Sequence, residues 1–145
     1  MRTDLLTVST DTPELDIVLP EGLEALISVC CGTRAVDDYL QALRRGRMYC
    51  PETQEQEKLG TGISVSVVST QRVRETIPNV YGTSSYLMSP YTALSYGGLM
   101  DYRAKSGSGG YALILAEKSP ENDQDIVASA LGIPSEELIQ LLKEK

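Results

Sequence analysis

The segment from Tyr86 to Pro120 constrains the fold most, because helix signals alternate there with one continuous apolar run. Ser89 followed by Pro90 predicts a helix start, since the serine oxygen can accept from an unpaired backbone N–H and proline fits the first helical position. Apolar residues then recur at helical spacing in two stripes, which predicts a helix covered on more than one side. The adjacent Gly97 and Gly98 cost a helix about 1 kcal/mol each, so we expect another backbone to pack closely against them.

The apolar run from Tyr111 to Ala116 is the neighbour that we expect for these glycines. A short, continuously apolar run is typical of a strand that is buried on both faces of a parallel sheet. Ser119 and Pro120 then repeat the helix-start signal. Open α/β sheets bind ligands where a strand end leads into a helix, because backbone N–H groups and the helix dipole converge there. The pattern predicts an α/β fold in which a short sheet is flanked by helices.

Two amphipathic helices are predicted near the N-terminus. Leu23 to Cys30 shows apolar residues at helical spacing and is closed by Gly32. The second helix has Thr33 as its cap and Gly46 as its stop. We therefore expect these two segments to form a helical hairpin. The second helix ends in Arg44, Arg45 and Arg47. These arginines form either a solvated helix end or a phosphate-binding patch.

Strand-like patterns occur in two further places. Asp4 to Ser9 has strand-like content, and Ile63 to Ser69 alternates apolar residues with serines, which predicts a half-buried strand whose serines face water. Ser69 can then cap a helix that we expect to stop at Pro78. Residues 51–58 are polar, which predicts a loop or a short exposed helix. At the C-terminal end we expect two helices that are separated by Gly132.

Composition restricts the function more than it defines it. A chain of 145 residues with 41% hydrophobic content predicts one domain over residues 1–145. A net charge of -7 argues against nucleic acid or an anionic membrane as a partner, because both attract clustered Lys and Arg. The sequence has no run of about 18 apolar residues and no signal-peptide core, so we expect a cytoplasmic location.

Histidine is absent from the sequence, and its three cysteines are Cys30, Cys31 and Cys50. Their spacing matches no metal site, and histidine-assisted nucleophilic catalysis lacks its base. We expect Cys30 and Cys31 to be small buried apolar residues. We assign no metal ligand and no catalytic residue in this chain.

Three sequence motifs resemble one family of enzymes. YLMSPYTAL, from Tyr86, is similar to YLMDPHTAV of pyridoxal-phosphate-dependent threonine synthases, and LILAEKSP occupies the place of their VVLSTASP strand-end motif. TPELDIVLPEGLEALI, from Thr12 to Ile27, resembles their SPSMDILxSSNxERLL. The motifs occur in the family's order, so the resemblance implies the C-terminal portion of the type II pyridoxal-phosphate fold, which is the tryptophan synthase β-like fold.

The resemblance also implies a function that this chain does not carry by itself. The parent reaction converts O-phosphohomoserine and water to threonine and phosphate on pyridoxal phosphate. The family's Schiff-base lysine and its cofactor phosphate loop both precede the matching region. The resemblance therefore implies that this chain alone is not active and binds no cofactor. Its implied partners are the N-terminal remainder of the enzyme or a partner subunit, and a small amino-acid substrate.

The candidate site residues are positions that match the family's motifs. The resemblance places Glu117 and Ser119 near the cofactor and Ser89 and Thr92 near the substrate. Glu117 replaces the threonine whose hydroxyl contacts the pyridine nitrogen in the family. Beside that nitrogen a carboxylate would raise the nitrogen's pKa and strengthen the ring as an electron sink. The alternative is that Glu117 is a solvated glutamate after a strand.

Other departures from the family's motifs affect the predicted substrate. The family's Asp and His in DPHTA are Ser89 and Tyr91 here, and Glu121, Asp123 and Asp125 follow Ser119. An anionic substrate prefers arginine, lysine or free N–H groups, so this end of the predicted site would repel a phosphate. Two alternatives stay open beside the fragment hypothesis: a paralogue with a different amino-acid substrate, and a non-catalytic interaction module whose apolar surfaces dock on a partner subunit.

Overall fold

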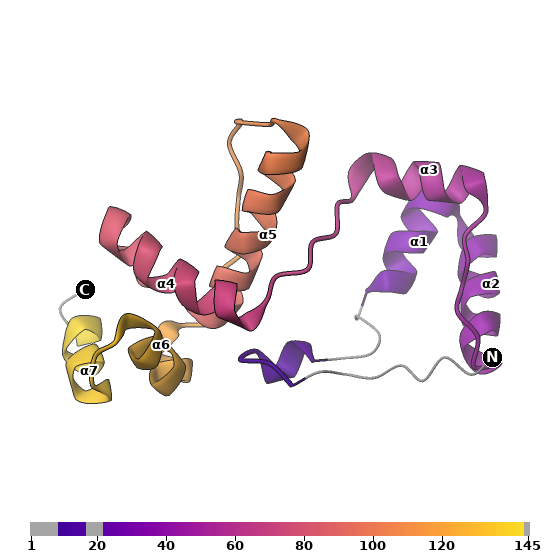
Figure 1. Ribbon diagram of the computed structural model, residues 1–145. Helices are drawn as coiled ribbons and strands as arrows, with labels where there is room; N and C mark the ends of the chain where they lie inside the picture. The colour runs from indigo at the N-terminus through magenta and orange to yellow at the C-terminus, as the bar shows by residue number, and fades with distance from the viewer. Residues whose placement is uncertain (1–8, 17–21, 144–145) are drawn as a thin grey trace. The chain divides into compact units, whose positions relative to one another are not determined.

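The computed structural model describes residues 9–16 and 22–143 (Figure 1). Within these ranges the chain forms seven α-helices and two short 3-10 helices, η1 (Pro13–Leu15) and η2 (Pro120–Asp123), and no β-strand. The predicted α/β class is therefore wrong for the described residues, which are helical. Two compact units are present: an N-terminal unit with Glu14–Ser64, and a C-terminal unit with Thr10–Pro13 and Val65–Lys145. The prediction of one domain stays a prediction.

The N-terminal unit contains the predicted helical hairpin. Helices α1 (Leu23–Cys31) and α2 (Thr33–Arg44) are separated by Gly32, whose φ of 90° is a conformation that favours glycine. Ile27, Ala35 and Tyr39 form the buried core of the hairpin. Helix α3 (Thr53–Gly62) follows, so the polar segment forms the helix that was one of two predicted alternatives.

The C-terminal unit consists of α4 (Thr70–Ser84), α5 (Pro90–Ser106), α6 (Gln124–Leu131) and α7 (Ser135–Lys143). Side-chain caps begin the first two helices as predicted: Ser69 Oγ accepts from the Arg72 amide at 3.2 Å, and Ser89 Oγ accepts from the Thr92 amide at 3.3 Å. Residues from α4, α6, α7, the N-terminal end of α5 and the segment between α4 and α5 share one core. It is made of Val73, Ile77, Leu87, Met88, Ala93, Val127, Ala128 and Leu138.

Pro78 lies inside α4 and does not end that helix, contrary to the prediction. Proline removes one helical hydrogen bond, which favours termination in an isolated helix. In this chain Val73 and Ile77 are buried in the core, and Val80 and Tyr81 beyond the proline pack against the same cluster. Burial on both sides of Pro78 therefore outweighs the missing hydrogen bond.

The run from Tyr111 to Ala116 is extended but is not a strand, and its predicted burial is wrong. Tyr111, Leu113 and Leu115 are 111%, 88% and 80% exposed, respectively. A strand requires a neighbouring strand for its backbone hydrogen bonds, and the described residues provide none for this run. The residues have strand-type composition, but the pairing partner is absent from the described part of the chain.

The second predicted strand, Ile63 to Ser69, is also extended and unpaired, and two residues of its predicted buried face are exposed. Val65 and Val67 are 81% and 93% exposed, whereas Ser66 is half-buried. The hydroxyl of Ser66 lies 3.5 Å from the carbonyl oxygen of Gly98 on α5. The predicted strand at Asp4 to Ser9 falls almost wholly outside the described residues, as does the middle of the motif from Thr12 to Ile27.

The close neighbour predicted for Gly97 and Gly98 exists, but it is a different segment. A Cβ added to Gly97 would lie 2.8 Å from Cγ1 of Val68, and one added to Gly98 would lie 3.8 Å from Cβ of Ser66. The segment before α4 therefore packs on the glycines, whereas we expected the run from Tyr111 to Ala116 to do so.

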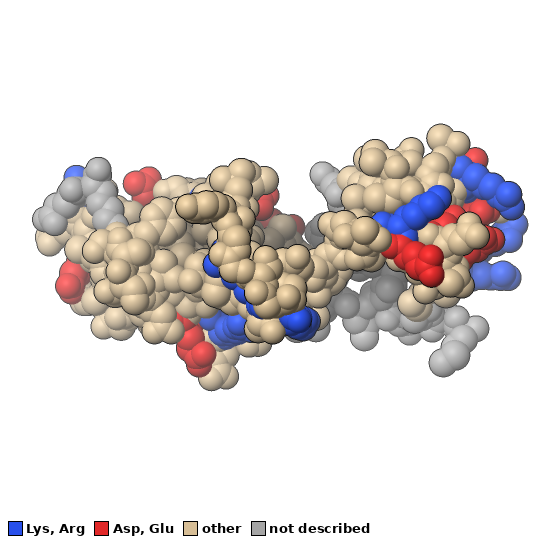
Figure 2. Space-filling model, turned by 90° about the horizontal axis from the view of Figure 1, so that it is seen from above, with Lys and Arg blue, Asp and Glu red and all other residues tan. Residues whose placement is uncertain are grey.

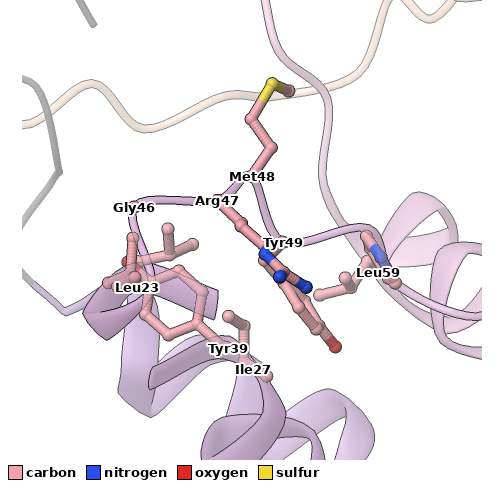
Figure 3. Close-up of a pocket in the computed structure, with 10 residues that line it drawn as sticks. Leu23, Ile27, Tyr39, Gly46, Arg47, Met48, Tyr49 and Leu59 are labelled. Carbon is pink, nitrogen blue, oxygen red and sulfur yellow. The ribbon is translucent and has the colours of Figure 1, made fainter. Parts of the chain in front are cut away.

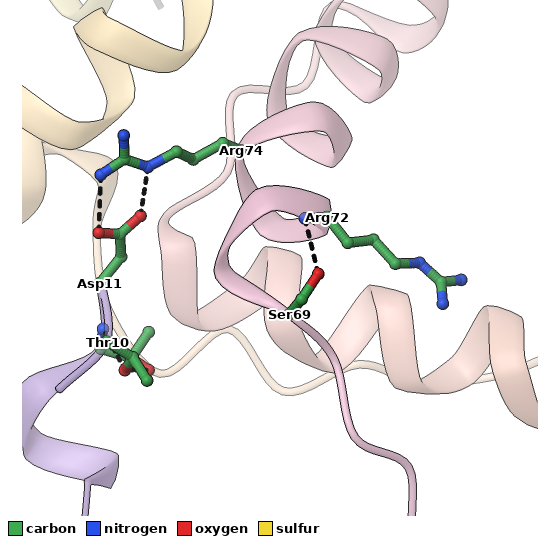
Figure 4. A network of polar contacts seen from close by, with 6 residues as sticks. Thr10, Asp11, Ser69, Arg72 and Arg74 are labelled. Carbon is green, nitrogen blue, oxygen red and sulfur yellow. Dashed lines mark hydrogen bonds and ion pairs between the residues drawn. The ribbon is translucent and has the colours of Figure 1, made fainter. Parts of the chain in front are cut away.

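Two ion pairs connect segments of the C-terminal unit. Arg74 on α4 donates through Nε and Nη2 to the two carboxylate oxygens of Asp11, at 2.6 and 2.9 Å (Figure 4). The hydrogen bond to Asp11 is the main cause that raises the pKa of Arg74. Arg72, one turn earlier in α4, pairs with Asp101 of α5.

None of the helices in the described ranges combines the length and the apolar character that crossing a bilayer requires, which is about 20 predominantly apolar residues.

Candidate functional site

The start of α5 carries both predicted substrate-binding hydroxyls, and both are committed to the helix. Ser89 is completely buried and Thr92 is 5% exposed. Their hydroxyl oxygens lie 3.2 Å apart, and Ser89 Oγ also accepts from the Thr92 amide. These contacts use the hydroxyl groups within the fold, so Ser89 and Thr92 act here as a buried helix cap.

The predicted cofactor-binding residues lie on the segment that leads into η2. Glu117 and Ser119 are exposed, and Ser119 Oγ accepts from the Glu121 amide at 3.4 Å as a cap of η2. Lys118, which lies between them, is half-buried. The structure therefore places Glu117 and Ser119 at the surface without enclosing either side chain.

Lys118 brings the two candidate regions together. Its Nζ lies 4.6 Å from the centre of the Tyr91 ring and 3.5 Å from the Tyr91 hydroxyl oxygen. This is a cation–π geometry, in which the face of the aromatic ring attracts the ammonium group. Tyr91 is a neighbour of Ser89 and Thr92 in the first turn of α5, so the end of the extended segment is held at the start of that helix. Sequence reasoning missed this pair, because no local pattern links residues 27 positions apart.

An open, acidic hollow follows this contact. Glu121, Asp123 and Asp125 are among the residues that line it, and one carboxylate oxygen of Asp123 is buried without a hydrogen-bond partner among the described residues. Negative charge in this hollow opposes the binding of a phosphate group. We find no group of His, Cys, Asp and Glu in the described residues that could hold a metal ion.

The lysines decide whether the described residues fit pyridoxal phosphate. The cofactor's attachment requires an enclosed lysine, yet Lys118 is the only half-buried lysine of the described ranges, and the others are exposed. The Lys118 ammonium group lies over Tyr91. Because Ser89 and Thr92 are also used as a cap, the described residues do not form a complete pyridoxal phosphate site.

A separate apolar cavity of about 370 Å³ lies in the N-terminal unit, between the helical hairpin and the segment that leads to α3 (Figure 3). Tyr39 and Tyr49 form one wall with an edge-to-face contact, their ring centres 5.6 Å apart. Among the described residues that line it, Arg47 alone is charged. The described lining residues are Leu23, Ile27, Tyr39, Leu43, Gly46, Arg47, Met48, Tyr49, Pro51 and Leu59.

Tyr49 is held at the edge of this cavity by Glu55 of α3. The Tyr49 hydroxyl donates to Glu55 Oε2 at 2.9 Å, and the same oxygen accepts from the Glu52 amide in a capping box. Burial, and then the bond to Glu55, raise the pKa of Tyr49 well above its ordinary value. The sequence predicted the apolar face of the hairpin but not the cavity, because residues 46–51 carry no regular pattern.

Charged side chains are mixed on the visible face of the N-terminal unit, where Lys and Arg lie beside Asp and Glu (Figure 2). Arg44, Arg45 and Arg47 are all exposed, as the solvated-end alternative requires. Cys30 and Cys31 are half-buried and Cys50 is exposed, and all three are free thiols.

Two threonine synthases are among the solved structures that this chain resembles. A threonine synthase from Brucella melitensis, solved with bound pyridoxal phosphate, superposes with a TM-score of 0.76 at 22% identity, over 88% of this chain and 27% of that chain. Yeast threonine synthase superposes with a TM-score of 0.77 at 21% identity, over 98% of this chain and 33% of that chain. This chain has the fold of part of a threonine synthase.

The likeness to threonine synthase is structural, and it covers only a part of the solved enzymes. This chain spans no more than about a third of the length of either solved threonine synthase. No protein-family model matches the sequence, and no curated protein matches it. The expected resemblance to threonine synthase is therefore confirmed at the level of the fold.

Proposed function

We propose that this chain is the C-terminal part, or a stand-alone relative of that part, of a cytoplasmic threonine-synthase-like enzyme that uses pyridoxal phosphate. The parent reaction would convert O-phosphohomoserine and water to threonine and phosphate. The observation that carries the proposal is the pair of TM-scores near 0.76, which cover most of this chain but only about a third of the solved enzymes. A small amino-acid substrate would then bind only after the remainder of the fold is added.

In this proposal the chain contributes structure and not the reacting groups. Ser89 and Thr92 fix the start of α5, and Lys118 fixes the following segment against Tyr91. The cofactor, when bound in the complete enzyme, would supply the electron sink. The lysine that holds it and the loop that binds its phosphate would come from the N-terminal remainder or from a partner subunit.

A paralogue with a different amino-acid substrate is the second candidate, and one observation favours it. The carboxylates of Glu121, Asp123 and Asp125 lie around one hollow beyond Ser119. Such a surface disfavours a phosphorylated substrate and tolerates an uncharged one. An assembled enzyme that turns over O-phosphohomoserine faster than unphosphorylated homoserine derivatives would exclude this candidate.

Titration with pyridoxal phosphate tests the proposal on the isolated chain. The protein is mixed with the cofactor, reduced with borohydride and mapped by peptide mass spectrometry. We expect no stoichiometric lysine adduct, because no described lysine is enclosed. Lys118→Gln is the informative variant and Lys105→Gln, at an exposed position, its matched control. A stoichiometric adduct that disappears in Lys118→Gln and persists in Lys105→Gln would mean that this chain carries its own site, contrary to the proposal.

A further inference from the structure

The apolar cavity of the N-terminal unit takes no part in the proposed function, yet it has the size and the lining of a small-molecule site. Its volume of about 370 Å³ falls in the range of about 300–1,000 Å³ that is usual for ligand pockets. Apolar side chains of α1, α2 and α3 line it, among them Leu23, Leu43 and Leu59. Because an apolar cavity of about 150 Å³ already holds benzene, this one has room for a ligand of about a dozen non-hydrogen atoms.

Arg47 adds a cationic group to this apolar lining. Its side chain is exposed, and its guanidinium group has no hydrogen-bond or ion-pair partner among the described residues. Figure 3 shows Arg47 and Tyr49 pointing to the same side of the segment that they share, whereas Met48 points away. A guanidinium group binds a carboxylate through two parallel hydrogen bonds, so Arg47 can hold an anionic head group beside the cavity.

The other polar groups at the cavity are already paired within the fold. The Tyr49 hydroxyl donates to Glu55 Oε2, which also accepts from the Glu52 amide. Glu55 is not among the described lining residues, and its carboxylate is engaged by these two donors. The rings of Tyr39 and Tyr49, in edge-to-face contact, form an apolar wall. The described lining therefore offers an apolar space and one free ionic group, which is positive.

We propose that this cavity binds a small amphipathic monocarboxylate. Its apolar chain or ring would lie between the helical hairpin and residues 46–51, and its carboxylate would pair with Arg47. Charge complementarity selects this class of ligand: a cation would be repelled by Arg47, and a small inorganic anion would leave the apolar space unfilled. The inference does not rest on the proposed function, because every residue that it uses belongs to the N-terminal unit.

The experiment titrates the full chain with decanoate and follows the backbone amides by two-dimensional NMR. Decylammonium and 1-decanol, which have the same chain with a cationic or a neutral head, are the matched probes. We expect saturable binding of decanoate with a Kd below about 1 mM, and shifts centred on residues 23–27 and 46–49. Binding of decanoate to the C-terminal unit alone, or the absence of saturable binding, would overturn the proposal.

An arginine pair tests the role of the head group. Arg47→Gln should weaken decanoate binding about tenfold and leave the affinity for 1-decanol unchanged, because only the charged hydrogen bonds are lost. Arg45→Gln is the matched control, since Arg45 is also exposed at the end of α2 but does not line the cavity. It should change the affinity for decanoate less than about twofold. Equal losses in the two variants would mean that general positive charge, and not Arg47, attracts the ligand.

A cavity-filling variant tests the apolar part of the site. Leu59→Trp should abolish the binding of decanoate, whereas Val29→Trp, at a position that is 85% exposed on α1, should leave it unchanged. Circular dichroism checks that both variants keep their helices, and if Leu59→Trp does not, the arginine pair decides alone. Equal affinities for decanoate, decylammonium and 1-decanol, all lost in Leu59→Trp, would identify a surface for apolar polypeptide contacts and overturn the proposal.

Discussion

Val68 packs so closely on Gly97 that a Cβ at position 97 would lie 2.8 Å from Cγ1 of Val68. The neighbouring Gly98 has room, since the nearest atom to an added Cβ is 3.8 Å away. The two adjacent glycines of α5 therefore differ in how much space a side chain would have, although the sequence analysis treats them as a pair.

Gly97→Ala should destabilise the chain by about 1–3 kcal/mol, because valine is stiff and the contact must be relieved by backbone movement. Gly98→Ala should be neutral or stabilise the chain by up to about 1 kcal/mol, through helix propensity. Urea unfolding followed by circular dichroism measures both. Equal losses in the two variants would show that the contact with Val68 does not set the difference.

Ser89→Ala should cost about 1–2 kcal/mol of unfolding free energy, because the buried hydroxyl caps α5 and bonds Thr92. Ser69→Ala is the matched control: Ser69 caps α4 in the same way but is exposed, so we expect a smaller loss. Both variants are compared in the same urea experiment. A larger loss at Ser69 would argue against burial as the reason.

Tyr49 should make the N-terminal unit sensitive to alkaline pH. Burial and Glu55 raise the pKa of Tyr49 in the folded chain, so the folded state holds this proton more tightly than the unfolded state. The stabilisation is fully present below about pH 10, the ordinary tyrosine pKa, and is lost as the pH rises through the folded value. Absorbance titration of the tyrosines together with thermal unfolding measures the effect. Tyr49→Phe should flatten this pH dependence, whereas Tyr86→Phe, at an exposed position, should not.

Asp11→Asn should loosen the attachment of residues 10–13 to α4. The bidentate bond between Asp11 and Arg74 would be weakened, because a carboxylate matches the guanidinium fork better than an amide does. We expect faster hydrogen exchange at the Thr12 amide, which donates to Thr10 Oγ1 in this segment. Added salt should produce the same change in the unaltered chain, since exposed pairs are screened. An unchanged exchange rate would mean that other contacts hold the segment.

Pro78→Ala should raise the unfolding free energy, by about 2–2.5 kcal/mol. Alanine restores a helical N–H in the middle of α4, and it is favoured over proline in a helix by about 3 kcal/mol. The greater freedom of the unfolded chain offsets about 0.4–1 kcal/mol of that gain. Thermal unfolding measures the change. A loss of stability would show that the proline ring packs usefully against its neighbours.

Local chemistry in the sequence predicted two helix starts and one helix end correctly, although not the end of α4. Ser69, Ser89 and Gly132 act within one turn of their own positions, so a short pattern is sufficient. Two of the three strand predictions, Ile63 to Ser69 and Tyr111 to Ala116, failed for the opposite reason. Val65 and Leu113 have strand-type composition, but a strand exists only when another strand pairs with it, and that information lies outside the segment.

The candidate site was predictable only in part. The helix cap by Ser89 was predicted from the Ser–Pro pair and is present, whereas substrate binding by Ser89 and Thr92 came only from the resemblance and stays a prediction. The Lys118 and Tyr91 contact and the apolar cavity beside Tyr49 both depend on residues brought together by tertiary structure. Periodicity describes one element at a time and cannot predict such encounters.

The exposed run from Tyr111 to Ala116 also affects how the chain behaves at high concentration. It contains six consecutive residues without charge, proline or glycine, which is the composition that favours stacking of identical segments into amyloid-like sheets. At high concentration, copies of this chain would therefore be prone to aggregation and to removal by chaperones and proteases.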